Sequence, residues 1–359
     1  MTDLLRPPDG VPRILDGPEG LAALERRAVV VPARREAVSV TGADAEAYLQ
    51  GQCSQDVASL EAGASALALL LTPQGKLDAL VRVTRMTAEH FVVDVDAGFA
   101  ELVVARLLRF RLRVRVDVDL LPWRCVALRG PLAAEVAAEL AGPGDVTADA
   151  RWRWCLGVDV LGPDVAVPDG VPQLADGAWQ AERIIMGQPI MGAELDEHTI
   201  AAEAGLLEPA VSLTKGCYTG QELVARLDAR GNRVARHLRG VVVPGTADAW
   251  GATSLVGADI LVGEPGAGAE GSGRSGVRAP SGAGGGHDTD GGVVGRVTSA
   301  AFSARIGGWV ALAYVHRRVQ PPASVRVVSR TGGVGVLPGE VRQLPMLRAR
   351  EPGEVHLPL

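Results

Sequence analysis

The chain has 359 residues, 47% of them hydrophobic and 22% charged, which is enough for two or three domains with a sizeable core. Its formal net charge of -6 excludes a general attraction to nucleic acid or to an anionic membrane surface. No signal-peptide pattern follows Met1, and the longest apolar run, around residues 64–71, is too short to span a bilayer. We therefore expect a cytoplasmic protein.

The N-terminal third mixes short apolar runs with helical patterns. Residues 1–28 are rich in proline, glycine and charge, so we expect a flexible arm with one short helical piece at 21–27. Capping-box spacing predicts a helix at 41–50 with Thr41 as its N-cap, and a second helix follows Asp96 as far as residue 110. Strands are predicted at 28–31, 37–40, 66–71, 77–85, 91–95 and 112–118. The irregular order of these elements favours an α+β unit over a doubly wound sheet.

A second α+β unit follows, and the last third of the chain is predicted to consist mainly of β-strands. In the second unit we expect strands at 125–128 and 152–160, helices at 131–140 and 179–186, and mostly loop over 191–207. Short strands separated by glycine and proline then predict a small barrel; they lie at 238–243, 253–262, 293–299, 309–314 and 324–328. The Gly/Ser/Ala-rich segment 263–292 cannot bury a core, so we expect a disordered insert there.

The octapeptide K-G-C-Y-T-G-Q-E at 215–222 carries the strongest chemical signal. Thr219 and Glu222 have capping-box spacing, which predicts a helix with Thr219 as its N-cap and Gly231 as its stop. Cys217 would then lie just before a helix N-terminus, where the partial positive charge and the Lys215 ammonium both favour the thiolate. This environment indicates a nucleophile, a redox thiol or a transient metal ligand; the alternative is a cysteine that only packs.

The other three cysteines give no indication of a metal site or of a second reactive thiol. Cys53, Cys125 and Cys155 form no C-x-x-C pair with one another or with Cys217, and no histidine cluster accompanies them. A structural zinc site or a permanent locally bound Fe–S cluster is therefore not expected, although Cys217 is a candidate for transient contact with a cluster. A cysteine–histidine dyad is also unsupported.

Three further features have both a functional and an ordinary interpretation. The predicted hairpin tip could present Lys76 and Asp78 to a ligand, or be an ordinary solvated turn. Lys76 and Lys215 are the chain's only lysines. Arg183 could grip an anionic group or form a helix-surface salt bridge. The basic run over 226–239 could bind a polyanion or form a solvated face.

The octapeptide resembles the signature of the YgfZ family, which are relatives of the glycine-cleavage T-protein. The likeness extends to an amide-rich turn at 48–56, to the hairpin at 71–76, to Arg183-Ile184 with Gly187, and to residues 240–319. It implies three domains around a central channel that binds tetrahydrofolate. These would be a first α+β folate-binding unit at 29–122, a second α+β unit with the octapeptide at 123–236, and a C-terminal β-barrel at 237–345.

The resemblance also implies a function and a set of site residues. The function is support of Fe–S cluster assembly or repair in client enzymes, including enzymes that modify tRNA. The expected partners are folate and Fe–S client or assembly proteins, with no nucleic acid, no membrane and a monomeric chain. Cys217 matches the family's signature cysteine and Lys215 one of its neighbours, and these two are the candidate catalytic residues. The candidate folate contacts are Lys76, Asp78, Arg183, Tyr218, Gln221, Glu222 and Arg226.

Two departures from the T-protein pattern bear on the reaction. Ile185 stands where that enzyme has a pterin-recognising glutamate, and Asp78 is followed by Ala79 where it has paired acids. Both weigh against aminomethyl transfer. A folate-dependent aminomethyltransferase of the T-protein type is nevertheless one alternative function, and a non-enzymatic scaffold that docks partners through residues 226–239 is another.

Overall fold

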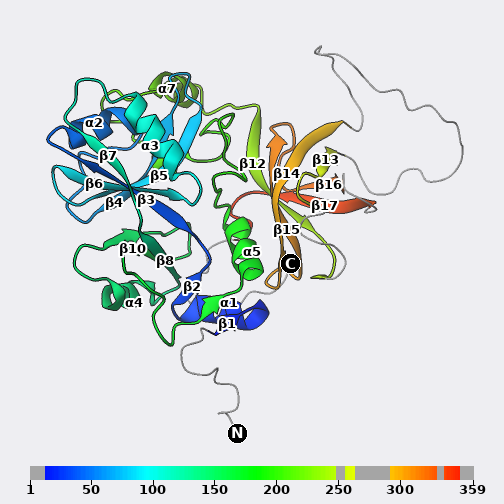
Figure 1. The fold of residues 1–359 in the computed structure, drawn as a ribbon. Coiled ribbons are helices and arrows are strands. Elements are labelled where there is room, and N and C mark those ends of the chain that lie inside the picture. The colour runs from blue at the N-terminus through cyan, green and yellow to red at the C-terminus, as the bar shows by residue number, and fades with distance from the viewer. Residues whose placement is uncertain (1–12, 248–254, 263–291, 330–334, 348–359) are drawn as a thin grey trace, which may run out of the picture.

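The first sheet has five strands and forms the core of the first α+β unit. In the computed structural model, which describes residues 13–247, 255–262, 292–329 and 335–347, this sheet has the order β4-β5-β6-β3-β7 (Figure 1). Its strands are β3 (Arg35–Thr41), β4 (Ser65–Leu71), β5 (Leu77–Arg85), β6 (His90–Asp96) and β7 (Asp117–Leu121), joined by α2 (Ala45–Gln52) and α3 (Ala100–Arg109). All neighbouring strands pair antiparallel. Val103 and Leu107, four residues apart on α3, are fully buried.

The second sheet has the order β1-β11-β2-β8-β10-β9. Its strands are β1 (Ile14–Leu15), β2 (Val29–Val31), β8 (Arg124–Arg129), β9 (Val146–Asp149), β10 (Gly157–Gly162) and β11 (Gln173–Leu174). The helices of this unit are α1 (Gly17–Arg26), α4 (Ala133–Leu140) and α5 (Asp176–Met186), followed by α6 (Leu207–Ala210) and α7 (Gln221–Ala229). Residues 13–28 are thus not an arm: they form β1 and α1, because Leu15, Ala23 and Leu24 are buried. The rest of the expected arm, 1–12, lies outside the described residues.

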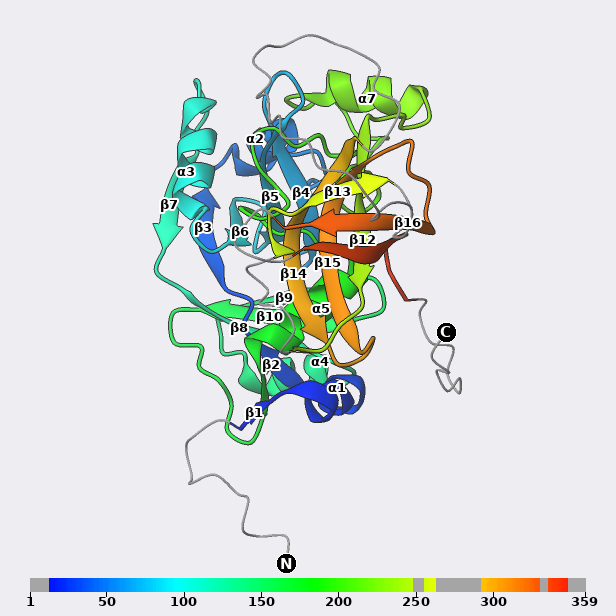
Figure 2. The same cartoon turned by 90° about the vertical axis from the view of Figure 1, so that its right-hand side faces the viewer.

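The C-terminal strands close into a barrel of order β12-β15-β14-β13-β16-β17, which confirms the predicted barrel and the α+β class (Figure 2). The strands are β12 (Arg236–Val243), β13 (Asp259–Val262), β14 (Val293–Ser303), β15 (Gly308–His316), β16 (Ala323–Val328) and β17 (Val336–Arg342). They enclose a separate apolar core that includes Val241, Ile260 and Val327. The expected insert, 263–292, falls outside the described residues except for its last position.

Tertiary contacts shift two of the predicted helix starts. Thr41 ends β3, and α2 begins four residues later, because the carboxylate of Asp44 accepts hydrogen bonds from Arg115 instead of capping the helix. Asp96 likewise does not cap α3, since its carboxylate pairs with Arg35 at 2.9 Å and accepts the Met191 N–H at 3.0 Å. In both cases a distant donor outcompetes the local helix terminus.

Two predicted strands are shorter than the sequence pattern suggests. The alternating run from residue 112 is not extended at its start, because Arg113 has φ +57° and Leu112 is 77% exposed; β7 begins only at Asp117. Trp152 and Cys155 exchange backbone hydrogen bonds around Arg153, at φ +55°, so the expected strand 152–160 begins with a tight turn. Only β10 remains extended there.

A buried ion-pair network joins the two sheets. Asp94 on β6 accepts from both Arg35 and Arg82. Arg82 also pairs across the unit boundary with Asp159 on β10, at 3.0 Å, and Asp159 pairs with Arg129 on β8, at 2.7 Å. Because Arg82, Asp94, Arg129 and Asp159 are each at most 3% exposed, no charge in this set has water as an alternative partner.

We predict that Asp94→Asn destabilises the protein strongly. The substitution removes the carboxylate that the buried Arg82 shares with Arg35, so that Arg82 and Arg129 are left with Asp159 as their one buried countercharge. Breaking a buried pair in this way costs about 3–5 kcal/mol. Urea denaturation followed by circular dichroism would measure the loss in the free energy of unfolding. Asp44→Asn removes a carboxylate from the exposed Arg115 and is the matched control, with a nearly unchanged midpoint. Equal losses of unfolding free energy in the two variants would show that the ion-pair network does not hold the two sheets together.

Candidate functional site

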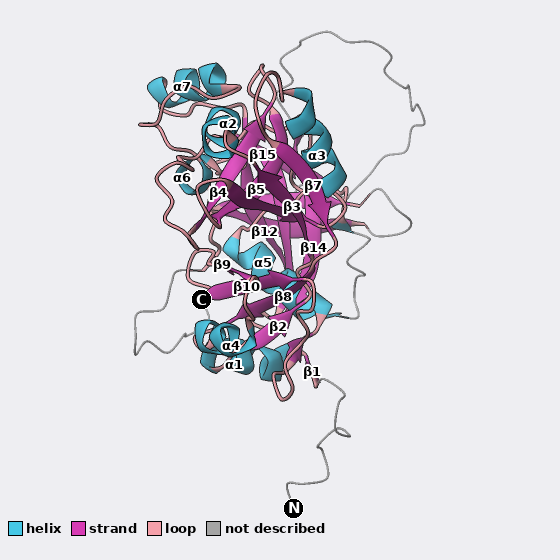
Figure 3. Cartoon of the chain, turned by 60° about the vertical axis from the view of Figure 1, so that its left-hand side comes forward, coloured by secondary structure: helices cyan, strands magenta, loops and turns pink. Residues whose placement is uncertain are grey.

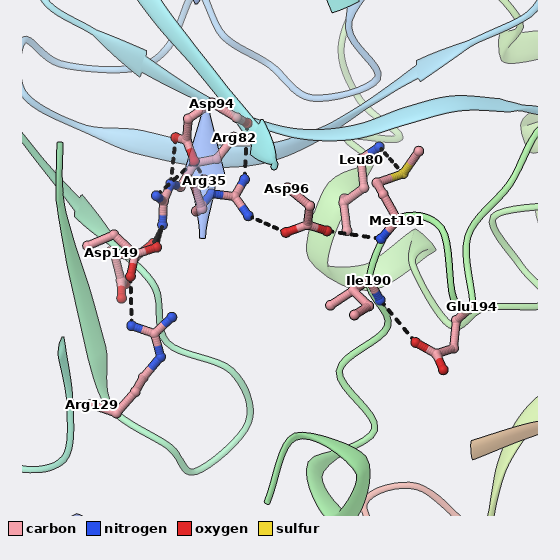
Figure 4. Close-up of polar contacts among 11 residues, drawn as sticks. Arg35, Leu80, Arg82, Asp94, Asp96, Arg129, Asp149, Ile190, Met191 and Glu194 are labelled. Carbon is pink, nitrogen blue, oxygen red and sulfur yellow. Dashed lines mark hydrogen bonds and ion pairs between the residues drawn. The ribbon is translucent and has the colours of Figure 1, made fainter. Parts of the chain in front are cut away.

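A cavity of about 270 Å³ opens between the two α+β units, directly beside the ion-pair network (Figure 4). It is close in size to the smaller ligand pockets, which start at about 300 Å³. Its walls come from the segment between β2 and β3, from β5, from residues 149–152, from α5 and from residues 188–191. Leu80, Ile190 and Met191 make part of the wall apolar.

The charged wall of the cavity is held rigid by pairing. Burial opposes ionisation of Asp159, but the nearby Arg129, Arg82 and Arg35 outweigh it and lower the pKa of this carboxyl to about 2. Asp96 bridges Arg35 to the Met191 N–H, and Met191 Sδ in turn lies 3.5 Å from the Leu80 N–H. Figure 4 shows this chain of contacts running from the sheets to the segment that carries Glu194. The cavity is therefore preformed rather than lined by loose side chains.

Two polar atoms in the cavity wall have no partner. The indole Nε1 of Trp152 and the amide Oε1 of Gln188 are buried and make no hydrogen bond within the described residues. A buried donor and a buried acceptor without partners each cost about 1–3 kcal/mol, which a ligand with complementary groups recovers. Arg34 and Arg151 also line the cavity, and both are exposed.

Arg183 lies at this cavity, but its guanidinium is already occupied. It donates to Gln180 Oε1 at 2.9 Å, to the Gln188 carbonyl at 2.8 Å, to Glu194 at 3.0 Å and to Ser299 Oγ at 2.9 Å. Glu194 also accepts from Ser299 and Thr298 of β14, so this pair attaches the barrel to the cavity wall. Sequence reasoning missed Glu194, since nothing local distinguishes a glutamate in a predicted loop. A direct folate contact by Arg183 stays a prediction.

The signature octapeptide lies elsewhere, against the β4–β5 hairpin tip and the end of α2 (Figure 3). Helix α7 begins at Gln221, and its N-cap is Gly220 at φ +83°, not Thr219. The reason is a close approach: a side chain at Gly220 would lie 2.5 Å from the Thr72 carbonyl, and the Thr219 N–H is bound to the Gly51 carbonyl. Gln221 Oε1 instead accepts the Tyr218 N–H at 3.2 Å.

Lys215 fastens this loop to the rest of the unit. Its Nζ donates to the carbonyls of Gln50, Cys53 and Gln55 at 2.6, 2.7 and 2.8 Å. Burial lowers the pKa of the ammonium, and the ring of Tyr218 lies 5.2 Å away. All three N–H donors of an ammonium are therefore used on main-chain oxygens rather than on the thiol expected from the sequence.

The loop leaves Cys217 exposed, with Glu222 and Arg226 also exposed on α7. Tyr218 is half-buried, and burial raises its pKa to about 12. None of the residues 215–226, all of which the structure describes, lines the cavity between the units. The cavity thus shares no residue with the octapeptide, and folate contacts by Tyr218, Gln221, Glu222 and Arg226 stay predictions.

The two predicted contacts on the β4–β5 hairpin, Lys76 and Asp78, lie in a third location, after the cavity and the octapeptide loop. Strand pairing passes from Ala79–Leu70 to Leu77–Leu71, so Asp78 is a bulged residue, and its carboxylate accepts from Arg106 at 2.7 Å. Arg106, which sequence reasoning missed, also donates to Gln52 and to the Leu71 carbonyl. A second hollow, of about 330 Å³, lies here between the hairpin and α3. Lys76 is exposed at the tip.

The comparisons with known proteins agree with this architecture. Residues 33–168 match the GCVT N-terminal domain model, and residues 281–346 match the glycine cleavage T-protein C-terminal barrel domain. The fold is similar to that of the glycine cleavage system aminomethyltransferase T from Bartonella henselae, with a TM-score of 0.67 at 20% identity, over 92% of this chain and 89% of that one. The protein therefore belongs to the class of glycine cleavage T-protein relatives.

Curated relatives show which members of that class the chain is similar to. The chain is 29% identical over 199 residues to an uncharacterised protein of Haemophilus influenzae, covering 54% of this chain and 66% of that one. It is 27% identical over 222 residues to the tRNA-modifying protein YgfZ of Vibrio vulnificus, covering 58% and 68%. It is 29% identical over 271 residues to the iron-sulfur cluster assembly factor IBA57 homolog of Chaetomium globosum, covering 67% and 60%. The chain spans about two thirds of the length of these relatives, and it is similar to proteins named YgfZ and IBA57.

Among the described residues, no three His, Cys, Asp or Glu side chains are grouped so that they could hold a metal ion. In the same part of the chain, no helix has the length and apolarity needed to cross a bilayer.

We predict that Lys215→Met loosens the signature loop. The substitution leaves three carbonyls without their donor, at a cost of about 1–3 kcal/mol, and Lys215→Arg does not restore the loop, because a planar guanidinium cannot converge on all three oxygens. Hydrogen exchange of the amides at 214–220 would rise in both variants. Lys76→Met changes the only other lysine, at an exposed tip, and should leave exchange unaltered. Unchanged exchange in Lys215→Met would refute the fastening role.

Proposed function

We propose that this protein binds a reduced folate between its two α+β units and supports Fe–S cluster assembly or repair in client enzymes, including enzymes that modify tRNA. The observation that carries the cluster-related part is the exposed Cys217 on a loop fixed by Lys215. A positioned, accessible thiol suits contact with another protein. The relatives named as a tRNA-modifying protein and as an iron-sulfur cluster assembly factor support the same direction.

The cavity between the units fits the ring system of a folate. A pterin presents alternating hydrogen-bond donors and acceptors along its edge, and the wall offers an unpaired donor on Trp152 and an unpaired acceptor on Gln188. The apolar side chains of Leu80 and Met191 suit the ring faces, and the exposed Arg34 and Arg151 suit the carboxylates of the tail. A bound reduced folate supplies nitrogen atoms able to carry one-carbon units.

The structure gives less support to aminomethyl transfer. Ile185, at the position of the expected glutamate, is fully buried, and so is Ala79, at the position of the second hairpin acid. The remaining acid, Asp78, is paired with Arg106. A low-identity match to an aminomethyltransferase of Pelodictyon phaeoclathratiforme, 26% over 225 residues, keeps this function as the second candidate. Turnover of an aminomethyl donor by the purified protein with tetrahydrofolate would decide in its favour.

We predict that Trp152→Phe weakens tetrahydrofolate binding about tenfold. The change removes the indole donor while keeping an aromatic ring, and losing one hydrogen bond of about 1.4 kcal/mol corresponds to that factor. Isothermal titration calorimetry would measure the affinity. Trp154→Phe, in the same turn but not in the cavity wall, is the matched control and should bind as wild type. A wild-type protein that does not bind tetrahydrofolate would refute the folate assignment.

We predict that Cys217→Ser abolishes support of Fe–S enzymes and leaves folate affinity unchanged, because the thiol lies outside the cavity wall. The activity of an Fe–S tRNA-modifying enzyme in cells that lack the protein, complemented with each variant, would report the first effect. Thr214→Ser changes an exposed residue of the same loop and should complement fully. Full complementation by Cys217→Ser would remove the thiol from the function.

A further inference from the structure

A surface built from two distant parts of the chain lies at the far end of α7 from Cys217. The Arg317 N–H, in the turn after β15, donates to the Ala235 carbonyl at 3.0 Å, and β15 pairs with β12 next to this bond. The turn after β15 therefore joins the segment that follows α7, as Figure 2 also shows. We define the arginine face as the five exposed arginines of these two segments: Arg226, Arg230, Arg233, Arg317 and Arg318.

A tight turn holds part of this face in position. Helix α7 ends with backbone bonds from Gly231 to the Asp228 carbonyl and from Asn232 to the Leu227 carbonyl, at 2.9 and 2.8 Å. Gly231 and Asn232 have φ values of +68° and +55°, a conformation that a non-glycine residue adopts at a cost. The turn is thus well defined, and Arg230 and Arg233 on either side of it remain exposed.

The charge of the arginine face is unbalanced. None of its five side chains has a hydrogen-bond or ion-pair partner within the described residues, and segments 226–233 and 316–318 contain one acidic residue, Asp228. The adjacent Arg236 contrasts with them, because it pairs with Glu203 at 2.8 Å and lies over the ring of Tyr314. A concentrated positive surface on a chain of net charge -6 attracts an acidic partner and steers its approach.

The face is close to the thiol. Helix α7 has nine residues and is therefore about 13 Å long, with Cys217 four residues before its start and the arginine face at its end. A protein seated on the face would thus reach along one short helix to the exposed Cys217.

We propose that the arginine face docks an acidic Fe–S protein beside Cys217, an inference that rests on the proposed function. Arginine pairs bidentately with the carboxylates of such a partner. RNA is the less suitable occupant, because single-stranded RNA needs aromatic stacking platforms and Tyr314, the ring beside this face, is 9% exposed and covered by Arg236.

The test is the affinity of an acidic plant-type [2Fe–2S] ferredoxin, measured by surface plasmon resonance at 50 and 250 mM salt. The variant R230E/R233E/R318E should weaken binding at least tenfold at low salt, with a smaller difference at high salt. The matched control R26E/R27E/R124E makes the same charge change on exposed arginines of α1, its C-terminal end and β8 and should bind as wild type. Equal thermal melting would show that both variants fold.

Three results would overturn the docking proposal: wild-type protein that does not bind the ferredoxin, equal binding by the two triple variants, or binding of tRNA in place of the ferredoxin that the first variant abolishes. Tetrahydrofolate affinity and Cys217-dependent complementation are measured in parallel. If docking fails while those two hold, only the docking inference is lost; if those two fail, the proposed function itself is lost.

Discussion

The ion pair between Arg82 and Asp159, supported by the Asp94 carboxylate that Arg82 shares with Arg35, is the contact on which the arrangement of the two α+β units depends. Arg82 continues the chain of charges to Asp159 and from there to Arg129. Buried charges of this kind are tolerated only when every member is paired, so the two sheets must meet in the one register that satisfies them all. The cavity opens beside this network, and its position is therefore set by electrostatic pairing as much as by apolar packing.

Strand β5 connects the cavity to the signature loop. Its N-terminal end follows the hairpin tip, where a side chain at Gly75 would lie 2.5 Å from Leu223 of α7. Farther along the same strand, Leu80 and Arg82 line the cavity. Strand β5 thus contributes to the wall of the proposed ligand site, and the hairpin tip that precedes it packs against α7, which follows the proposed thiol site.

The barrel supports the cavity from outside. No described barrel residue lines the cavity, yet Thr298 and Ser299 bind Glu194, and the Tyr314 hydroxyl donates to the Glu194 carbonyl at 3.0 Å. Glu194 and Arg183 hold the segment that contains Gln188. The barrel also supplies Arg317 and Arg318 to the arginine face. The barrel therefore positions part of the cavity wall, and it contributes residues to the proposed docking surface.

The sequence by itself determined the α+β class, the barrel and the exposed cysteine in its signature loop, because apolar periodicity, glycine and proline spacing and the octapeptide are all local patterns. Only the tertiary structure decided that the Lys215 ammonium binds carbonyl oxygens and not a thiolate, and that Gly220 is the N-cap of α7 in place of Thr219. It also decided that the Asp78 carboxylate pairs with Arg106. Glu194 and Trp152 were likewise beyond local patterns, as was the placing of Arg317 and Arg318 beside the basic run that the sequence showed at 226–239. In each case the deciding partner lies far away in the chain, and a polar side chain binds whichever group the folded chain brings within reach.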